Sequence, residues 1–203
     1  MAITDALATA AEYRTVTGKT DTGSDTQILV DLKAVSRYLE GKLGRFFTKD
    51  AADVTRLYIP VLSSSRLRID DLSASPTSIT IDEDDDGSFA DETALAATDY
   101  ELHPLNALLG PEVWPYTSIV LTPWGTKGIW PVGNRVQIVG KFGWPAVPEP
   151  LKAATIQFTA IYRLETPRAT SRISELDGVI SSSQEAQTII RRLTDQYKEY
   201  HVS

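Results

Sequence analysis

The sequence predicts an α+β fold: a small helical bundle, an inserted antiparallel β-sandwich or barrel-like module, and a C-terminal amphipathic helix. Apolar residues recur at three- and four-residue steps near both ends of the chain, and they alternate with polar residues in its middle. No helical period separates the alternating segments, which excludes parallel βαβ units. The expected divisions are bundle helices (1–50), the β-module (51–143), the central bundle helix (144–170), and a flexible arm with a last helix (171–203).

Two helices are predicted before the β-module. A short helix is expected over Ala6–Tyr13, with Thr4 or Asp5 as its cap. A longer helix is expected after the polar loop Thr17–Asp25, and Gly44 stops it. The apolar positions of the longer helix include three residues that we assign to the bundle core: Leu32, Val35 and Leu39.

Six short strands are predicted between the helices. Each is an alternating segment bounded by clusters of Ser, Pro, Gly or Asp, which is typical of an antiparallel sandwich or small barrel. The predicted strands are Val54–Ile59, Arg66–Ile69, Thr77–Asp82, Asp99–His103, Tyr116–Thr122 and Arg135–Phe142.

The central helix of the bundle is predicted to follow the last of these strands. Pro148 has the φ of a first helical turn and needs no N–H partner there, so the helix is expected to start at this residue. Apolar residues then form two stripes along the helix, which indicates neighbours on two sides. The Thr166-Pro167 pair ends it. One stripe supplies three further core residues: Leu151, Ala154 and Phe158.

The last predicted helix, Gln184–Tyr200, lacks an obvious partner within the chain. Its apolar stripe is narrow, and the polar segment Ser171–Ser183 before it is expected to be flexible. We therefore interpret the helix as available to a partner protein. The stripe consists of Ile189, Ile190, Leu193 and Tyr197.

Composition excludes several classes of protein. With 203 residues, 42% apolar and 23% charged, the chain is long enough for one domain with an insertion or for two small domains. No apolar run approaches the roughly 18–20 residues that span a bilayer, and Met1–Ala11 does not resemble a signal peptide, so we expect a cytoplasmic protein without membrane contact. The absence of cysteine excludes disulfides and thiolate sites. A formal net charge of −7 argues against sequence-independent binding of nucleic acid.

An acidic segment, Asp82–Gly87, matches the opening of an EF-hand calcium loop, D-x-D-x-D-G. The closing carboxylate of such a loop would fall on Thr93, and Glu92 is one residue too early. No helices flank the segment. We therefore expect a solvated acidic turn and no metal site. A calcium-dependent hydrolase is the enzyme that such a loop would allow.

The other candidates do not define an active site. His103 beside Glu101 could serve acid–base catalysis, but the chain has no nucleophile motif, phosphate-binding loop or metal-ligand spacing, so we assign no catalytic residue and no cofactor. Four tryptophans interleaved with prolines could stack on sugars or bases. Because a basic groove is missing, burial or a protein interface is favoured for them. They are Trp114, Trp124, Trp130 and Trp144.

The layout resembles that of the head-tail connector, or adaptor, proteins of tailed bacteriophages and phage-like gene transfer particles. The similarity covers most of residues 1–165, from a helix that ends in Phe46-Phe47, through a β-insertion, to a helix. The most specific part is the junction Phe142-Gly143-Trp144, Val147-Pro148, Leu151 and Ala154. Inside the insertion, the segments that look like strands of this family are Leu67–Leu72, Asp99–Leu102 and Pro104–Ala107.

The resemblance implies a structural virion protein at the head-tail junction, assembled in the host cytoplasm, and not an enzyme. Connector subunits form a homo-oligomeric ring, expected here to be a dodecamer, between the portal protein and a tail-side stopper or tail terminator protein. DNA passes through the lumen without specific binding. The last helix would bind the portal through Ile189, Ile190, Leu193 and Tyr197. The alternative is a β-sandwich module of a phage particle that binds carbohydrate or a receptor.

Overall fold

The computed structural model describes residues 6–110, 112–165 and 184–197. These residues form four helices and six strands, which confirms the predicted α+β class. The chain divides into two compact units: a helical unit of Met1–Thr48 with Val147–Ser203, and a β unit of Lys49–Ala146. The predicted flexible arm, Ser171–Ser183, lies outside the described residues. None of the described helices has the length and apolar character needed to cross a membrane.

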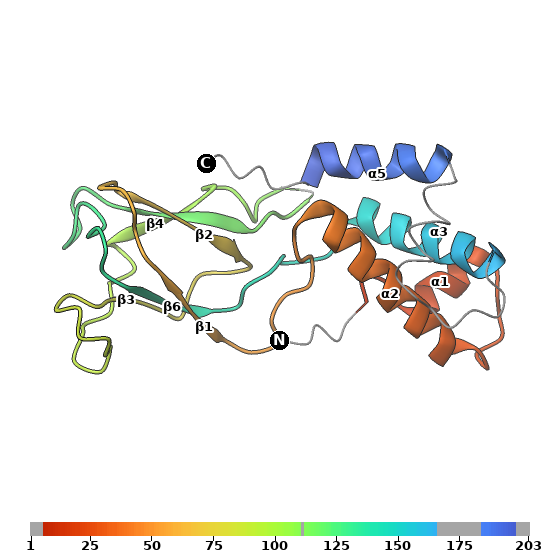
Figure 1. Cartoon of the computed structure of the whole chain (residues 1–203), viewed down its shortest axis with the longest axis horizontal. Helices are drawn as coiled ribbons and strands as arrows, with labels where there is room; N and C mark the ends of the chain where they lie inside the picture. Colours follow the sequence, from red (N-terminus) through yellow and green to blue (C-terminus); the bar gives the residue numbers. More distant parts are fainter. Residues whose placement is uncertain (1–5, 111, 166–183, 198–203) are drawn as a thin grey trace. The chain divides into compact units, whose positions relative to one another are not determined.

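The helical unit is built around α2 (Asp25–Leu43) and α3 (Glu149–Glu165), which pack against each other. The short helix α1 (Ala10–Thr17) contacts both of them, and so does α5 (Gln184–Tyr197). Figure 1 shows α5 running alongside α3 and α2. The two apolar stripes of α3 are explained by this arrangement, because the helix has neighbours on several sides. All six residues assigned to the bundle core are buried: Leu32, Val35, Leu39, Leu151, Ala154 and Phe158.

The ends of the helices follow local capping chemistry. The first helix starts at Ala10, four residues later than predicted, because Thr9 and Glu12 form a reciprocal capping box. The second helix ends as predicted: Gly44 adopts a left-handed φ of 68° and donates its N–H to the carbonyl of Glu40. The third helix starts at Glu149, directly after Pro148.

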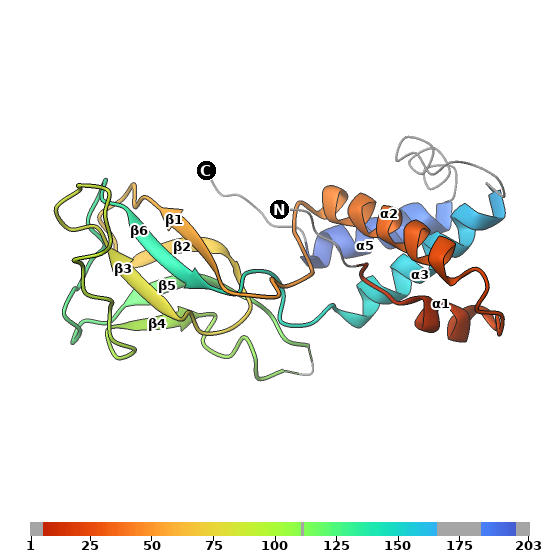
Figure 2. The same ribbon diagram turned by 90° about the horizontal axis from the view of Figure 1, so that it is seen from below.

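The β unit contains two three-stranded antiparallel sheets, and all six predicted strands are present among the described residues. One sheet has the order β1-β6-β3 and the other β2-β5-β4; Figure 2 shows the first of them, with β6 between its two neighbours. The apolar faces of both sheets contribute to one buried cluster, so the unit has its own core. The strands are β1 (Val54–Tyr58), β2 (Arg66–Leu72), β3 (Ser78–Ile81), β4 (Tyr100–His103), β5 (Tyr116–Leu121) and β6 (Val136–Gly140).

Candidate assembly surfaces

The apolar stripe of α5 is largely turned into the helical unit. Ala186, Leu193 and Tyr197 are buried. The ring of Tyr197 meets the ring of Phe47 edge to face, with centroids 5.8 Å apart, and the carbonyl of Tyr197 accepts a hydrogen bond from Arg45 Nη1 at 3.4 Å. The expectation that this helix has no partner within the chain is therefore wrong. The partner includes the aromatic residue just after α2, which a search for periodic stripes does not find.

The other half of the α5 stripe remains partly accessible. Ile189 and Ile190 are half-buried, and Arg191 and Arg192 next to them are exposed. Gln157 of α3 donates to Glu185 at 3.0 Å, which is an exposed contact near the start of α5. The structure thus separates the four residues of the portal-binding hypothesis into two buried anchors and two residues that a partner could reach. Their role in binding a portal stays a prediction.

A second candidate surface lies on the loops that connect β1 to β2 and β5 to β6. Two backbone hydrogen bonds tie these loops together, from Gly133 N–H to the Pro60 carbonyl at 3.0 Å and from Trp130 N–H to the Ser64 carbonyl at 2.9 Å. The indole of Trp130 is buried in the core of the β unit. We call the exposed apolar residues of the two loops the apolar tip: Ile59, Val61, Leu62, Trp124, Ile129 and Val132.

The apolar tip is a feature that our sequence analysis missed. Val61 is 79% exposed and Val132 is 54% exposed, and the hydrogen bond from Gly133 N–H to the Pro60 carbonyl holds their two loops together, so large apolar side chains of both loops are presented to solvent. Several exposed apolar residues on neighbouring loops mark protein contacts more often than isolated exposed residues do. The signal in the sequence was the run of apolar residues within turn segments, where polar residues are usual.

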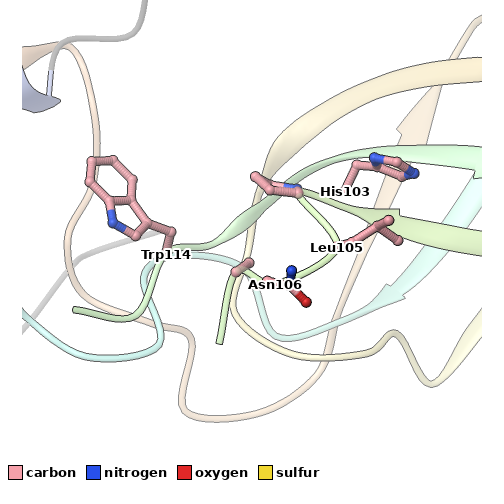
Figure 3. Close-up of a pocket in the computed structure, with 6 residues that line it drawn as sticks. His103, Leu105, Asn106 and Trp114 are labelled. Carbon is pink, nitrogen blue, oxygen red and sulfur yellow. The ribbon is translucent and has the colours of Figure 1, made fainter. Parts of the chain in front are cut away.

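A third candidate is an apolar pocket of about 420 Å³ at the end of β4. Figure 3 shows Trp114 on one side of it and His103 and Leu105 on the other, with Asn106 between them. His103 Nε2 lies 3.6 Å from a carboxylate oxygen of Glu101, and the remaining lining is mostly apolar. The geometry offers a place for an apolar group, and the described residues around it do not include a nucleophile paired with His103.

The four tryptophans do not form one stacking platform. Trp130 and Trp144 are buried, Trp114 is half-buried against Trp144 with ring centroids 4.9 Å apart, and Trp124 is exposed. The indole nitrogen of Trp144 donates to Asp71 at 3.1 Å. Burial therefore accounts for three of them, as the sequence favoured, and Trp124 belongs to the apolar tip.

The acidic segment is only partly a solvated turn. Asp84 and Asp86 are exposed as expected, but Asp82 at the end of β3 is fully buried. One carboxylate oxygen from each of these three residues lies within 4.8 Å of the others, a grouping that could hold a metal ion. The expectation of solvation is wrong for Asp82 because the carboxylate turns inward toward the N–H of Gly87 and the guanidinium of Arg135.

Two buried carboxylates in α2 are structural. Asp31 pairs with Arg163 of α3 and also accepts from Gln27 at 3.1 Å. Glu40 accepts the N–H of Phe47 at 3.1 Å, and its other oxygen lies 2.8 Å from Arg37 Nη1. Burial raises the pKa of Glu40 above its ordinary value, and those two contacts only partly oppose the rise.

Comparison with known proteins finds a likeness in fold. No protein-family model matches the chain, and no curated protein sequence matches it. In solved structures, its fold is similar to that of a chain from the neck of an empty GTA (gene transfer agent) particle computed with C6 symmetry. The TM-score is 0.58 at 16% identity, over 96% of this chain and 90% of the other. The two chains therefore share a fold that includes both the helical and the β unit.

Proposed function

We propose that this protein is a structural neck protein of a phage-like particle, a head-tail connector that forms a ring between portal and tail. The observation that carries the proposal is the shared fold with a neck chain over nearly the full length of both chains. A fold can host several functions, but here the likeness covers both units, including the β unit inserted between the helices.

The symmetry of the related particle supports a ring. Its neck was computed with C6 symmetry, so a chain that obeys this symmetry occurs six times or in a multiple of six. A dodecamer of the present chain fits that requirement. Each subunit would make head-to-tail contacts with two identical neighbours, and the apolar tip offers surface that such contacts could cover.

Charge supports a channel through which DNA moves. The formal net charge is −7, and carboxylates facing a lumen repel phosphates and so prevent DNA from sticking to the wall. DNA would then pass without specific binding, and the subunit would need neither a catalytic residue nor a membrane anchor. Assembly in the host cytoplasm, followed by residence in the virion, completes this proposal.

For the portal contact, we propose the accessible half of the α5 stripe. Ile189 and Ile190 would enter an apolar groove of the portal, while Leu193 and Tyr197 hold α5 on the bundle. The opposite end of the ring would face a tail-side stopper or tail terminator protein. This arrangement gives all four residues a role without requiring α5 to leave the helical unit.

Negative-stain microscopy of the purified protein mixed with the portal protein of the same particle tests the proposal. We expect rings seated on the portal, and we expect the Ile189→Asp/Ile190→Asp variant to lose them because buried carboxylates are costly in an apolar groove. Thr188→Asp, which places one carboxylate on the exposed face, is the control and should still bind. Absence of any association with the portal, together with tailed particles formed without this protein, would refute the connector role.

A carbohydrate- or receptor-binding module is the second candidate, and the structure supports it less well. A sugar platform requires aromatic faces open to solvent, and only Trp124 among the four tryptophans is largely exposed. Binding to a glycan array that is lost in Trp124→Ala would favour this candidate over the connector.

A further inference from the structure

We propose that the loop Asp82–Gly87 binds a calcium ion through the carboxylates of Asp82, Asp84 and Asp86. Their ligand oxygens lie within 4.8 Å of one another, a spacing that one cation in contact with all three can bridge. Acidic clusters are common on protein surfaces, so grouping alone does not define a site. The state of Asp82 is the independent observation that points to a cation.

Asp82 is a buried carboxylate whose interactions are incomplete. It is 0% exposed, and its Oδ2 accepts from the N–H of Gly87 at 3.1 Å and lies 3.4 Å from Arg135 Nε. Its Oδ1 is also buried, and no hydrogen bond to that oxygen is found among the described residues. Leaving a charged oxygen buried without a partner is costly, and a cation ligand removes that cost.

The loop arranges its backbone as a calcium loop does. Asp82, Asp84 and Asp86 occupy positions 1, 3 and 5 of the EF-hand pattern, and Gly87 occupies position 6, where the chain turns sharply. Gly87 has a φ of 86°, a left-handed conformation that favours glycine. Position 7 contributes a backbone carbonyl in this pattern, which here belongs to Ser88.

The charge around the loop also favours a cation. Five consecutive carboxylates, from Asp82 to Asp86, face two basic side chains: Arg135, near Asp82 and Asp85, and Lys127, which pairs with Glu83 at 2.7 Å. Arg135 is bound to Oδ2 of Asp82 and so leaves Oδ1 available. The group retains an excess of negative charge that a divalent ion would reduce.

The ligand set selects calcium over other divalent ions. All the donors are oxygens, which excludes metals that prefer imidazole or thiolate. Calcium accepts irregular sets of six to eight oxygens, whereas magnesium demands near-ideal octahedral geometry. Because the closing position holds Thr93, and Glu92 instead accepts the N–H of Glu83 at 2.7 Å, water would complete the shell. We therefore expect weak binding, with a Kd on the order of 0.1–1 mM.

Calorimetric titration of the full-length, chelator-treated protein with calcium chloride tests the site. We expect saturable binding of about one ion per chain, and at least about tenfold weaker binding of magnesium. Asp86→Ala should weaken calcium binding by about tenfold or more, because it removes a ligand oxygen of the cluster. The matched control is Glu83→Ala, which removes a carboxylate of the same loop that lies outside the cluster, and it should weaken binding by less than about threefold.

Three results would overturn the proposal: no saturable uptake up to about 5 mM calcium, equal losses in the two variants, or equal affinities for calcium and magnesium. Equal losses would assign the uptake to diffuse attraction by the acidic loop. Circular dichroism of each variant verifies that it is folded, and both altered residues are exposed, so neither change removes a core contact.

Discussion

The replacement Phe158→Ala measures how much the central helix contributes to the stability of the helical unit. Phe158 is 0% exposed, and a buried phenylalanine removes roughly 150–250 Å² from water, which at about 25 cal/mol per Å² corresponds to about 4–6 kcal/mol. Alanine retains part of that burial but leaves a cavity, so the expected cost is about 3–5 kcal/mol. This is a large fraction of the stability of an ordinary domain, which is about 5–15 kcal/mol.

The two units can be followed separately during urea unfolding. All four tryptophans lie in the β unit, so tryptophan fluorescence reports that unit, whereas far-UV circular dichroism at the helical minimum reports mainly the helices. At a slope of about 2 kcal/mol per molar urea, a cost of about 4 kcal/mol lowers the circular dichroism midpoint by about 2 M. The fluorescence midpoint should move much less, because the β unit has its own buried core.

An exposed phenylalanine provides the matched control for Phe158. Phe46 is 59% exposed, and Phe46→Ala should change the free energy of unfolding by no more than about 0.5 kcal/mol. A shift of less than about 0.5 M in the circular dichroism midpoint of Phe158→Ala would refute the core assignment. The reasoning from burial would also fail if the two variants were destabilised equally.

Two further predictions concern the same unit. Tyr197→Ala should lower the stability of the helical unit by about 3 kcal/mol, because the ring is fully buried and meets Phe47. Asp195→Ala, at an exposed residue of the same helix, should have little effect on the urea midpoint. An unchanged midpoint for Tyr197→Ala would show that α5 contributes little to the helical unit. Burial raises the pKa of Glu40 in the folded protein. At pH values just above 4.5, the native protein therefore binds more protons at Glu40 than the unfolded chain does. The contribution of Glu40 to stability consequently falls as the pH rises through the folded pKa. Glu40→Gln should therefore flatten the decline of the circular dichroism midpoint with pH in that window, and an identical decline in both proteins would contradict the assignment.

Periodic patterns predicted most of the fold, because regular elements repeat the same burial every few residues. The strand segments and the start of α3 were found within a few residues, and the core positions of α2 were identified from spacing alone. The start of α1 was misplaced because two polar residues before Ala6 looked like caps, while the capping box at Thr9 completes two hydrogen bonds instead of one. Local rules identify residues that could cap a helix, but the hydrogen bonds formed in the folded protein decide which of these residues is the cap.

The candidate surfaces were harder to predict, because they depend on which loops meet. The apolar tip combines two loops that lie about seventy positions apart in the sequence, and the hydrogen bond from Gly133 to Pro60 that joins them leaves no local pattern in the sequence. For Asp82 the sequence showed the motif but not the environment of the carboxylate. The burial of Asp82 depends on Gly87 and Arg135, and only the folded β unit places Arg135 against the loop.

The position of α5 allows one helix both to stabilise the helical unit and to bind a partner. A narrow stripe suffices to attach it, since Leu193 and Tyr197 reach the bundle while Ile189 and Ile190 stay partly accessible. A partner that binds those two isoleucines would meet a helix already held in place and would not have to supply the ordering entropy of a free segment. Loss of Tyr197 should therefore weaken attachment to a portal as well as the fold, whereas loss of the isoleucine side chains should affect attachment alone. If the proposed portal contact is correct, these two classes of variant must differ in this way.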